Sequence, residues 1–422
     1  LGLIRTKAVP QSEGNYHLSG SKIFISAGEH NLTENIIHLV LARTPDAPSG
    51  IKGISLFLVP KFNVHDDGTL AELNGVFCSG IEHKMGINAS STCSIEFDNA
   101  KGFLVGELNK GMKAMFVMMN SARLHVGIQG LAIAQASYCS AKDYAKERLQ
   151  GRALSGAKYP EQAADPLIVH PDIRRMLMTM KAYTEGARAL SSWLSYKLDL
   201  SQHADNKQQR QEADELVSLL TPVFKSFLTD IGETVTSLGI QVYGGHGYIR
   251  ENGMEQYLRD ARISKIYEGA NGIQALDLVG RKLPEQMGKY LRHFFHPISN
   301  FLEQYANDKP LTAYILPLQK SFSRLQQATL FIAQKGLSDP DEAASAASDY
   351  LNMFGLVALG YMWAKMAEQI TYRKGEMSAD FYDAKLKTGL FYMQRLLPQT
   401  GSLLSNILAG CNSTMSLKEE QF

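Results

Sequence analysis

The hydrophobic pattern of the chain changes its period once, near residue 105, and this change limits the possible architecture more than any other feature. Before it, the segment NYHLSGSKIFISAG (residues 15–28) alternates apolar and polar side chains around a glycine, as half-buried strands do. Further short strands are predicted at residues 35–44, 53–62 and 90–100. Because no amphipathic helices separate these strands, we predict a central antiparallel β-barrel or sandwich domain over residues 1–104.

From about residue 110 the apolar residues recur at helical spacing. Helices are predicted at residues 110–155, 171–203 and 211–239, and the polar segment 201–214 is predicted to be a helix–helix turn. With the segment that ends at residue 282, they predict a four-helix bundle over residues 105–284.

Residues 290–407 are helical again, with Asp339-Pro340-Asp341 as a helix start. We therefore predict an additional helical domain over residues 285–422 and an α+β multidomain fold. The longest uncharged stretch, residues 350–364, is too short for a membrane span and predicts a buried helix.

Charge and cysteine content exclude several classes of protein. A net charge of +1 gives no support to nucleic-acid binding, which needs clustered basic residues. The four cysteines are scattered without metal-ligand or disulfide spacing, and no HxH, HxxxH or HExxH pattern occurs, so no metal site is expected. A reducing cytoplasm fits this pattern best.

Two local motifs each leave two interpretations open. The glycine-dense QVYGGHGYIREN (residues 241–252) does not follow a strand, so it is not a dinucleotide fingerprint. It is either a helix C-terminus, with Gly244 and Gly245 allowing positive φ, or a backbone that approaches a ligand closely. Arg148, in KERLQGRAL, either complements a helix C-terminus or pairs with a phosphate.

The segment KIYEGANGIQ (residues 265–274) places one carboxylate, Glu268, between Tyr267 and Gly269. It is either an exposed acid near a helix N-terminus or a carboxylate partly enclosed by apolar neighbours such as Ile266 and Ile273. In an apolar pocket a carboxylate becomes a stronger base, able to remove a proton from carbon.

Three segments in this order resemble the acyl-CoA dehydrogenase family: residues 20–28, 122–154 and 241–274. The resemblance covers residues 1 to about 282. It implies an N-terminal helical domain, a central β-domain and a C-terminal four-helix bundle, with FAD between the last two. Only the second and third of these are recognised in this sequence. We therefore expect a fragment that lacks the helical N-terminal domain and the first flavin-contacting loop.

The resemblance also implies roles for the residues that match the substrate site. Glu268 matches the base that removes the α-proton of the acyl-CoA, while the β-hydrogen leaves as hydride to flavin N5, and its main-chain N–H would help to hold the thioester carbonyl. Asn120 and Arg123 match a helix start that lines the acyl-CoA site, and Tyr267 and Gly269 flank the base.

Eight positions match the family's FAD contacts. Phe24 and Ser26 stand where the family has residues beside the flavin, and Arg148 matches an arginine that reaches an FAD phosphate across a dimer interface. The others are Gln241, Gly244 and Gly245 near the adenine, contributed by a partner subunit, and Ala270 and Gly272, where the family usually carries Thr and Gln.

The extra helical domain and the segment HKMGINASSTC (residues 83–93) resemble a subgroup of long bacterial dehydrogenases that includes 3-methylmercaptopropionyl-CoA dehydrogenases. This implies FAD-dependent dehydrogenation of an acyl-CoA, with 3-methylmercaptopropionyl-CoA as the expected substrate, an electron-transfer flavoprotein as acceptor, and a homodimer or homotetramer. The alternatives are a fatty acyl-CoA dehydrogenase of β-oxidation, an acyl-CoA oxidase, and a non-catalytic DNA-associated homologue.

Overall fold

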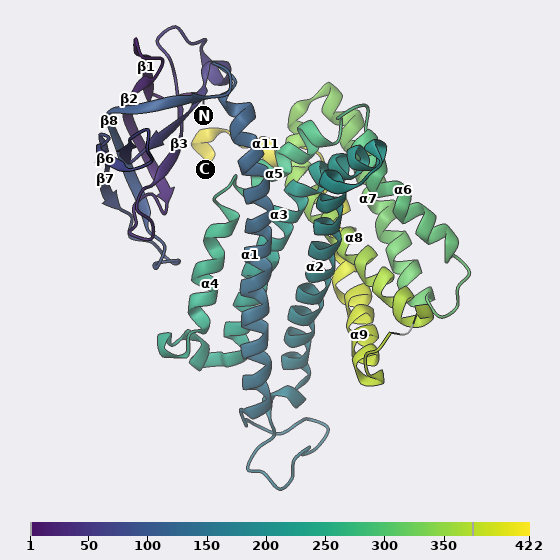
Figure 1. Ribbon diagram of the computed structural model, residues 1–422. Coiled ribbons are helices and arrows are strands. Elements are labelled where there is room, and N and C mark those ends of the chain that lie inside the picture. Colours follow the sequence, from purple (N-terminus) through teal and green to yellow (C-terminus); the bar gives the residue numbers. More distant parts are fainter. Residues whose placement is uncertain (1, 374) are drawn as a thin grey trace. The chain divides into compact units, whose positions relative to one another are not determined.

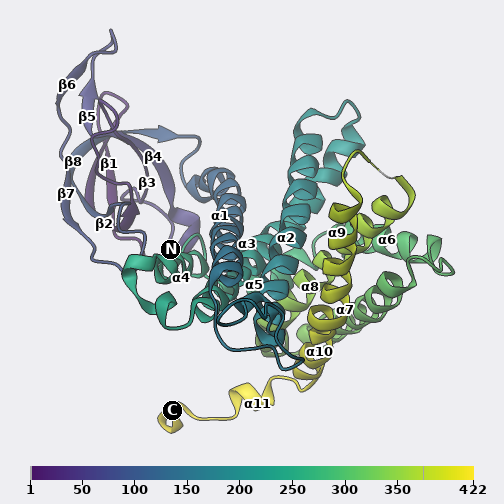
Figure 2. The ribbon, with the colours of Figure 1, turned by 90° about the horizontal axis from the view of Figure 1, so that it is seen from below.

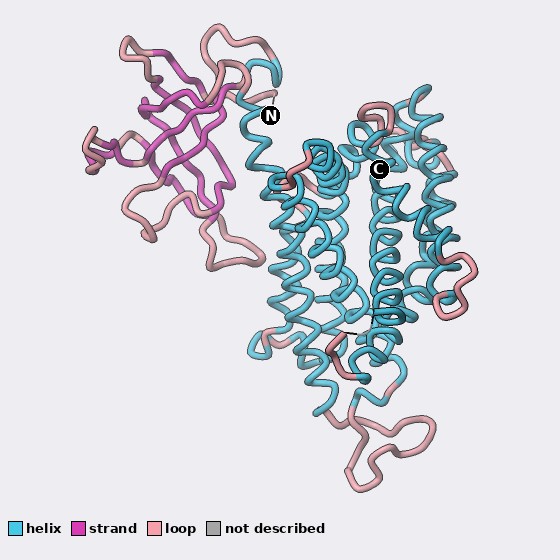
Figure 3. The backbone as a smooth tube through the Cα atoms, turned by 45° about the vertical axis from the view of Figure 1, so that its right-hand side comes forward, coloured by secondary structure: helices cyan, strands magenta, loops and turns pink. Residues whose placement is uncertain are grey.

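The computed structural model describes residues 2–373 and 375–422. The chain divides into two compact units, Leu1–Ala122 and Arg123–Phe422. Figure 3 shows that the strands all belong to the first unit and that the second is built from helices and loops.

The first unit holds a six-stranded antiparallel sheet and a separate two-stranded hairpin. The strands are β1 (Lys7–Pro10), β2 (Tyr16–Ser26), β3 (Ile37–Ala42), β4 (Ser55–Pro60), β5 (Phe62–Val64), β6 (Leu70–Leu73), β7 (Val76–Ile81) and β8 (Thr92–Val105), with the short 3₁₀ helix η1 (Gly50–Gly53) before β4. The order is β1-β2-β8-β4-β3, with β7 also paired to β8, and β5 pairs with β6. The predicted antiparallel β-domain is therefore confirmed.

The long strand β8 organises this sheet. Its first half pairs with β2 on one side and β7 on the other, and its last residues, Phe103 to Val105, pair with β4. One isolated parallel bridge, between Lys7 and Arg43, links β1 to the residue after β3. Since the ladders themselves do not join end to end, the sheet is not a closed barrel. Its core is a compact apolar cluster that includes Leu18, Phe57 and Ile95.

Three long helices lie side by side in Figure 1. They are α1 (Gly111–Glu147), which begins in the first unit and continues into the second, α2 (Pro171–His203) and α3 (Lys207–Tyr243). The short 3₁₀ helix η2 (Leu167–Val169) precedes α2. The prediction of α2 matches the observed bounds, but the turn predicted over residues 201–214 is wrong except at residues 204–206, because α2 runs to His203 and α3 begins at Lys207. Asn206 caps α3, because its side chain accepts hydrogen bonds from the backbone N–H groups of Gln208 and Gln209, and the polar residues that follow form the exposed first turns of the helix.

The fourth part of the predicted bundle is a series of short helices. These are η3 (Gly244–Tyr248), η4 (Arg250–Asn252), α4 (Met254–Arg262), η5 (Ile263–Lys265), α5 (Asn271–Asp277) and the π-helical η6 (Leu278–Lys282). Left-handed backbone at Gly244, Gly253 and Glu268-Gly269 interrupts the segment, since an α-helix cannot continue through positive φ.

The remaining helices follow residue 288. They are α6 (Lys289–Gln304), α7 (Thr312–Ser338), α8 (Pro340–Arg373), α9 (Ala379–Phe391), η7 (Tyr392–Leu396), η8 (Leu397–Gln399), α10 (Thr400–Leu408), α11 (Asn412–Met415) and η9 (Glu419–Gln421). As expected, α8 begins at Pro340 and buries its uncharged stretch. None of the helices in the described residues is long and apolar enough to cross a membrane.

One hydrophobic core runs through the second unit, from Leu131 in α1 to Ile407 in α10. In Figure 2, which looks along the long helices, α8 lies between α5 and α7. Its Trp363 donates from Nε1 to the carbonyl oxygen of Ala182 in α2, at 3.2 Å. Helices on both sides of residue 284 thus share a core, and the predicted domain boundaries at residues 104 and 284 stay predictions.

Candidate active site and cofactor-binding pocket

Glu268 lies in the short loop between η5 and α5, in a backbone conformation that is unusual for a side-chain-bearing residue. Its φ is 54°, and the φ of Gly269 is 86°. The left-handed region is strained for residues other than glycine, and such strain concentrates at functional sites. The side chain is half-buried, whereas the neighbouring Ile266 and Ile273 are more than half exposed. The loop thus holds one carboxylate in a conformation that the surrounding residues must maintain.

Two buried polar residues, Lys225 and Gln274, donate hydrogen bonds to the backbone of this loop. Lys225, in the middle of α3, donates from Nζ to the carbonyl oxygen of Gly269 at 2.8 Å and to Oδ1 of Asn271 at 2.9 Å. Gln274 donates from Nε2 to the carbonyl oxygens of Glu268 and Gly269, both at 3.3 Å. Neither Lys225 nor Gln274 has any exposed surface. Burial lowers the pKa of Lys225 to about 8.

Asn271 ties the loop to one turn of α3. Its Nδ2 donates to the carbonyl oxygen of Ser226 at 3.2 Å, to Oγ1 of Thr229 at 3.0 Å and to Oδ1 of Asp230 at 3.0 Å. Asp230 also forms an ion pair with Lys265 at 3.0 Å, and burial raises the pKa of the Asp230 carboxyl. The loop is therefore connected to α3 by hydrogen bonds on both sides of Gly269.

The acyl-CoA residues predicted on α1 lie well inside that helix, which begins at Gly111, and not at a helix start. Arg123 is buried and forms an ion pair with Asp277 at 3.5 Å, and burial lowers its pKa while Asp277 acts in the opposite direction. Asn120 is exposed and belongs to the first unit. Tyr267 donates a hydrogen bond from its hydroxyl to Oε1 of Gln129, also on α1. Within the second unit, α1 therefore contacts the loop on the side of Tyr267.

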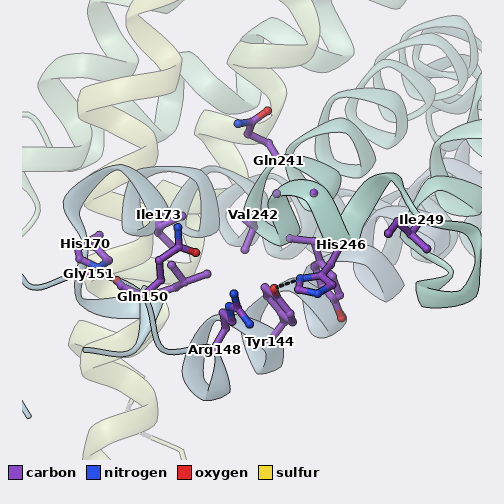
Figure 4. A pocket seen from close by; sticks show the side chains of 14 residues that line it. Tyr144, Arg148, Gln150, Gly151, His170, Ile173, Gln241, Val242, His246 and Ile249 are labelled. Atoms are coloured by element: carbon purple, nitrogen blue, oxygen red, sulfur yellow. Dashed lines mark hydrogen bonds between the residues drawn. The ribbon is translucent and has the colours of Figure 1, made fainter. Parts of the chain in front are cut away.

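A second constellation surrounds a pocket of about 760 Å³ (Figure 4). Four of the residues predicted to bind FAD line it, namely Arg148, Gln241, Gly244 and Gly245. The lining comes from the end of α1, the start of α2 and the end of α3 with the glycine turn that follows. Residues that are distant in the sequence thus meet at one cavity.

The pocket offers a cation, aromatic surfaces and open backbone. Arg148 is exposed immediately after α1, and its guanidinium forms no ion pair within residues 2–373 and 375–422. Tyr144 stacks on Tyr243 at a ring-centroid distance of 4.0 Å, and its hydroxyl shares a hydrogen bond with Nδ1 of His246 at 2.9 Å. Gly244 ends α3 with φ 59°, and a Cβ added there would meet no atom within 4 Å. Of the two interpretations of this segment, the helix C-terminus is observed at Gly244, with positive φ there but not at Gly245, and the backbone has free space beside it.

The other predicted cofactor positions are accessible. Phe24 and Ser26 lie at the end of β2 beside a register shift between Lys22 and Ile25, where Phe24 has φ 58° and an exposed fraction of 67%. Ala270 and Gly272 are exposed at the N-terminus of α5.

All four cysteines are free thiols. No cluster of three potential metal ligands occurs in the part of the chain that the structure describes.

The polar residues that hold the loop, Lys225, Asn271 and Gln274, were missed by sequence reasoning. Lys225 is the only charged residue in residues 216–229, LVSLLTPVFKSFLT, and this isolation in an apolar helix is a signal that could have identified it. Asn271 and Gln274 carry no comparable signal, because polar residues are ordinary in the first turn of a helix.

Comparison with known proteins gives the family. Residues 109–283 match the family model for the acyl-CoA dehydrogenase C-terminal domain, and residues 294–418 match the model described as acetyl-CoA dehydrogenase C-terminal like. The chain is 42% identical to the 3-methylmercaptopropionyl-CoA dehydrogenase of Ruegeria pomeroyi, over 96% of this chain and 69% of that protein. It is 33% identical to a butyryl-CoA dehydrogenase of Syntrophomonas wolfei, over 100% of this chain and 71% of that protein.

A solved structure agrees in fold. The acyl-CoA dehydrogenase from Bacillus anthracis, complexed with FAD, superimposes with a TM-score of 0.74 at 21% identity, over 96% of this chain and 66% of that one. The chain spans about two thirds of each of these three proteins. It belongs to the acyl-CoA dehydrogenase family of FAD-dependent oxidoreductases.

Proposed function

We propose that this chain catalyses the α,β-dehydrogenation of an acyl-CoA thioester to the trans-2-enoyl-CoA, with Glu268 as the base. The observation that carries the proposal is the loop of Glu268, in which a strained backbone presents a single half-buried carboxylate and is tied down by Lys225, Asn271 and Gln274. A carboxylate fixed in this way is suited to general base catalysis at carbon, which depends on exact placement.

The residues around the second pocket fit part of a flavin dinucleotide. The exposed guanidinium of Arg148, which forms no ion pair among the described residues, suits a phosphate, and the open backbone at Gly244 and Gly245 allows close approach of a nucleotide. We assign Arg148, Gln241, Gly244 and Gly245 to the phosphate and adenine end of FAD. Phe24, Ser26, Ala270 and Gly272 are assigned to other contacts with FAD, which, when bound, supplies the acceptor for the β-hydride.

The protein's own steps concern the α-carbon. The Glu268 carboxylate takes the α-proton, so the base must be ionised before the reaction. Its main-chain N–H stabilises the negative charge that develops on the thioester oxygen as the proton leaves. Asn120, Arg123, Tyr267 and Gly269 are assigned to binding of the acyl-CoA.

The proposed substrate is 3-methylmercaptopropionyl-CoA, because the relative named for it shares 42% identity over nearly the whole chain. A fatty acyl-CoA of β-oxidation is the second candidate, which the identity to a butyryl-CoA dehydrogenase supports. We further propose an electron-transfer flavoprotein as the acceptor, a homodimer or homotetramer, and a cytoplasmic location, which the four free cysteines favour.

The test is a Glu268→Gln substitution in the FAD-loaded protein. We expect the variant to retain FAD but to lose at least about 1,000-fold in the rate of flavin bleaching by acyl-CoA under anaerobic conditions, because the amide cannot accept the proton. The exposed Glu251→Gln serves as the matched control and should bleach normally. Substantial bleaching in Glu268→Gln would reject the assignment of the base.

A panel of thioesters that includes 3-methylmercaptopropionyl-CoA and butyryl-CoA ranks the substrates by kcat/KM. Rapid reoxidation of the bleached flavin by oxygen would favour an acyl-CoA oxidase over a dehydrogenase. Absence of bleaching by every thioester, together with binding of duplex DNA, would favour the non-catalytic homologue.

A further inference from the structure

Lys225 is a buried cation to which the proposed reaction gives no direct role. It has no exposed surface, and no other residue from 216 to 229 of α3 is charged. A lysine is rarely buried completely unless its ammonium group is hydrogen-bonded, since removal of a charge from water is unfavourable. The two hydrogen bonds that its ammonium group donates explain why a lysine is tolerated at this point of α3.

Both acceptors of Lys225 lie in the loop of Glu268. The carbonyl oxygen of Gly269 belongs to the residue directly after the base, and Oδ1 of Asn271 belongs to the first residue of α5. No ion pair joins Lys225 to the Glu268 carboxylate in the described residues. The hydrogen bonds of Lys225 therefore reach the backbone that carries the base, and the Glu268 carboxylate contributes only at longer range, where it acts to raise the pKa of Lys225.

Asn271 completes this attachment. While its Oδ1 accepts from Lys225, its Nδ2 donates to Ser226, Thr229 and Asp230. One asparagine thus contacts a full turn of α3 next to the lysine. A positive φ at Glu268 persists only when surrounding contacts enforce it. These hydrogen bonds are such contacts, because they fix the residues that follow Glu268.

We propose that Lys225, together with Asn271, is a positioning residue that holds the Glu268 loop in its left-handed conformation. This inference rests on the proposed function, because it assumes that Glu268 is the base. Loss of the lysine donor leaves the Gly269 carbonyl oxygen with only the longer hydrogen bond from Gln274, at 3.3 Å, and the loop then moves the carboxylate away from the α-carbon. Substrate binding is affected far less than the chemical step.

The test compares two neutral variants in the FAD-loaded protein, Lys225→Met and Lys225→Gln. Both side chains approximate the length of lysine, but only the glutamine can donate a hydrogen bond. We expect Lys225→Met to lower kcat about 100-fold with KM changed less than about threefold, as for a misplaced catalytic group. Lys225→Gln should recover about tenfold of that loss, because one donor is restored.

A second readout does not depend on turnover. Hydrogen exchange at the backbone amides of residues 266–272 should be faster in Lys225→Met than in the unmodified protein, and intermediate in Lys225→Gln. Lys289→Met is the matched control. Lys289 also contacts α3, through Glu215 at 2.8 Å, but it lies outside the loop. This control should leave both kcat and loop exchange unchanged.

The inference is overturned if Lys225→Met folds, keeps kcat within about threefold and shows unchanged loop exchange. If Lys225→Met does not fold, Asn271→Ala tests the same attachment from the loop, with the same expected loss of kcat and faster exchange; normal kcat in that variant also overturns it. Glu268→Gln separates the two proposals. If it is inactive while Lys225→Met is normal, only the role of Lys225 fails, whereas an active Glu268→Gln rejects the base itself.

Discussion

Lys225 has no exposed surface, and its burial disfavours the charged form of the amine. Burial lowers its pKa from the ordinary value of 10.5 to about 8, although Asp230 and Glu268 act in the opposite direction. Each unit of such a shift corresponds to about 1.4 kcal/mol of difference between the two protonation states. The loop of the proposed base is therefore attached through a group that the fold prefers to keep neutral above about pH 8.

This shift predicts how stability depends on pH. Between about pH 8 and 10.5 the folded protein has released the Lys225 proton while the unfolded chain still binds it, so the contribution of Lys225 to stability rises with pH in this window. Below pH 8 both states are protonated, and the contribution is constant. We expect the Tm of the unmodified protein minus that of Lys225→Met to increase from pH 7.5 to pH 10. A difference that stays flat or falls over this range would contradict the assigned shift.

How far single residues can be predicted depends on whether their neighbours are close in sequence. The residues beside Glu268 leave an exposed acid and an enclosed carboxylate both open, and its proposed role comes from the family resemblance of residues 241–274. Its side chain is half-buried, while the apolar neighbours Ile266 and Ile273 are more than half exposed. Lys225 lies 44 residues before Gly269, and nothing in the local pattern of α3 reveals which carbonyl it faces. The positive φ of Glu268 likewise depends on tertiary contacts, so the local sequence, in which glycine stands at 269 and not at 268, does not predict it.

At the scale of helices, α1 and α3 cross with their backbones in direct contact. A Cβ added at Gly130 would lie 2.6 Å from the carbonyl oxygen of Leu228 and 2.9 Å from Cα of Thr229. A Cβ at Gly232 would lie 3.0 Å from the carbonyl oxygen of Gly130. This crossing lies near Lys225 on α3 and Gln129 on α1, which contact the two ends of the loop of Glu268.

We therefore predict that Gly130→Ala forces the two helices apart. The added methyl group meets backbone atoms that cannot rotate away, and overpacking of this kind costs about 1–3 kcal/mol, against which the better helix propensity of alanine offsets about 1 kcal/mol. Differential scanning calorimetry should show a lower Tm, and activity should fall as Gln129 shifts relative to Tyr267. Gly280→Ala, where a Cβ meets nothing within 4 Å, is the control and should keep its Tm. Equal Tm values for the two variants would show that the crossing is not tight.

Elements were predicted well where periodicity is strong and poorly where polar residues continue a helix. The antiparallel strands and α2 followed directly from their patterns. The predicted start of α3, residue 211, is too late. The helix begins after its cap, Asn206, and its first residues face solvent, so their polar sequence resembled that of a loop. The breaks between residues 244 and 282 were missed, since only backbone conformation distinguishes a series of short helices from one helix with glycines.

At the scale of the whole chain, the C-terminal helices are part of the same core as the bundle. Two family models meet between residues 283 and 294, yet Trp363 of α8 is buried against α2, and Gly355 lies where a Cβ would be 2.3 Å from the ring of Phe227 in α3. Lys385 of α9 also forms an ion pair with Glu185 of α2, at 2.8 Å. Hydrophobic periodicity identifies each helix but not the helix against which it packs, so the interior shared by the bundle and the C-terminal helices could not be predicted from the sequence.

The shared core predicts that the helices before and after residue 284 unfold together. Trp363→Ala removes a fully enclosed ring and its hydrogen bond to Ala182, and substitutions of this kind cost about 3–5 kcal/mol. We expect amide hydrogen exchange to accelerate by a similar factor in α2, α3, α7 and α8, because one cooperative unit loses stability. Trp193→Ala, at a partly exposed site on α2, is the control and should have a smaller effect on all four helices. If only α7 and α8 lost protection in Trp363→Ala, the C-terminal helices would be an independent folding unit. The stability of the Glu268 loop would then not depend on them.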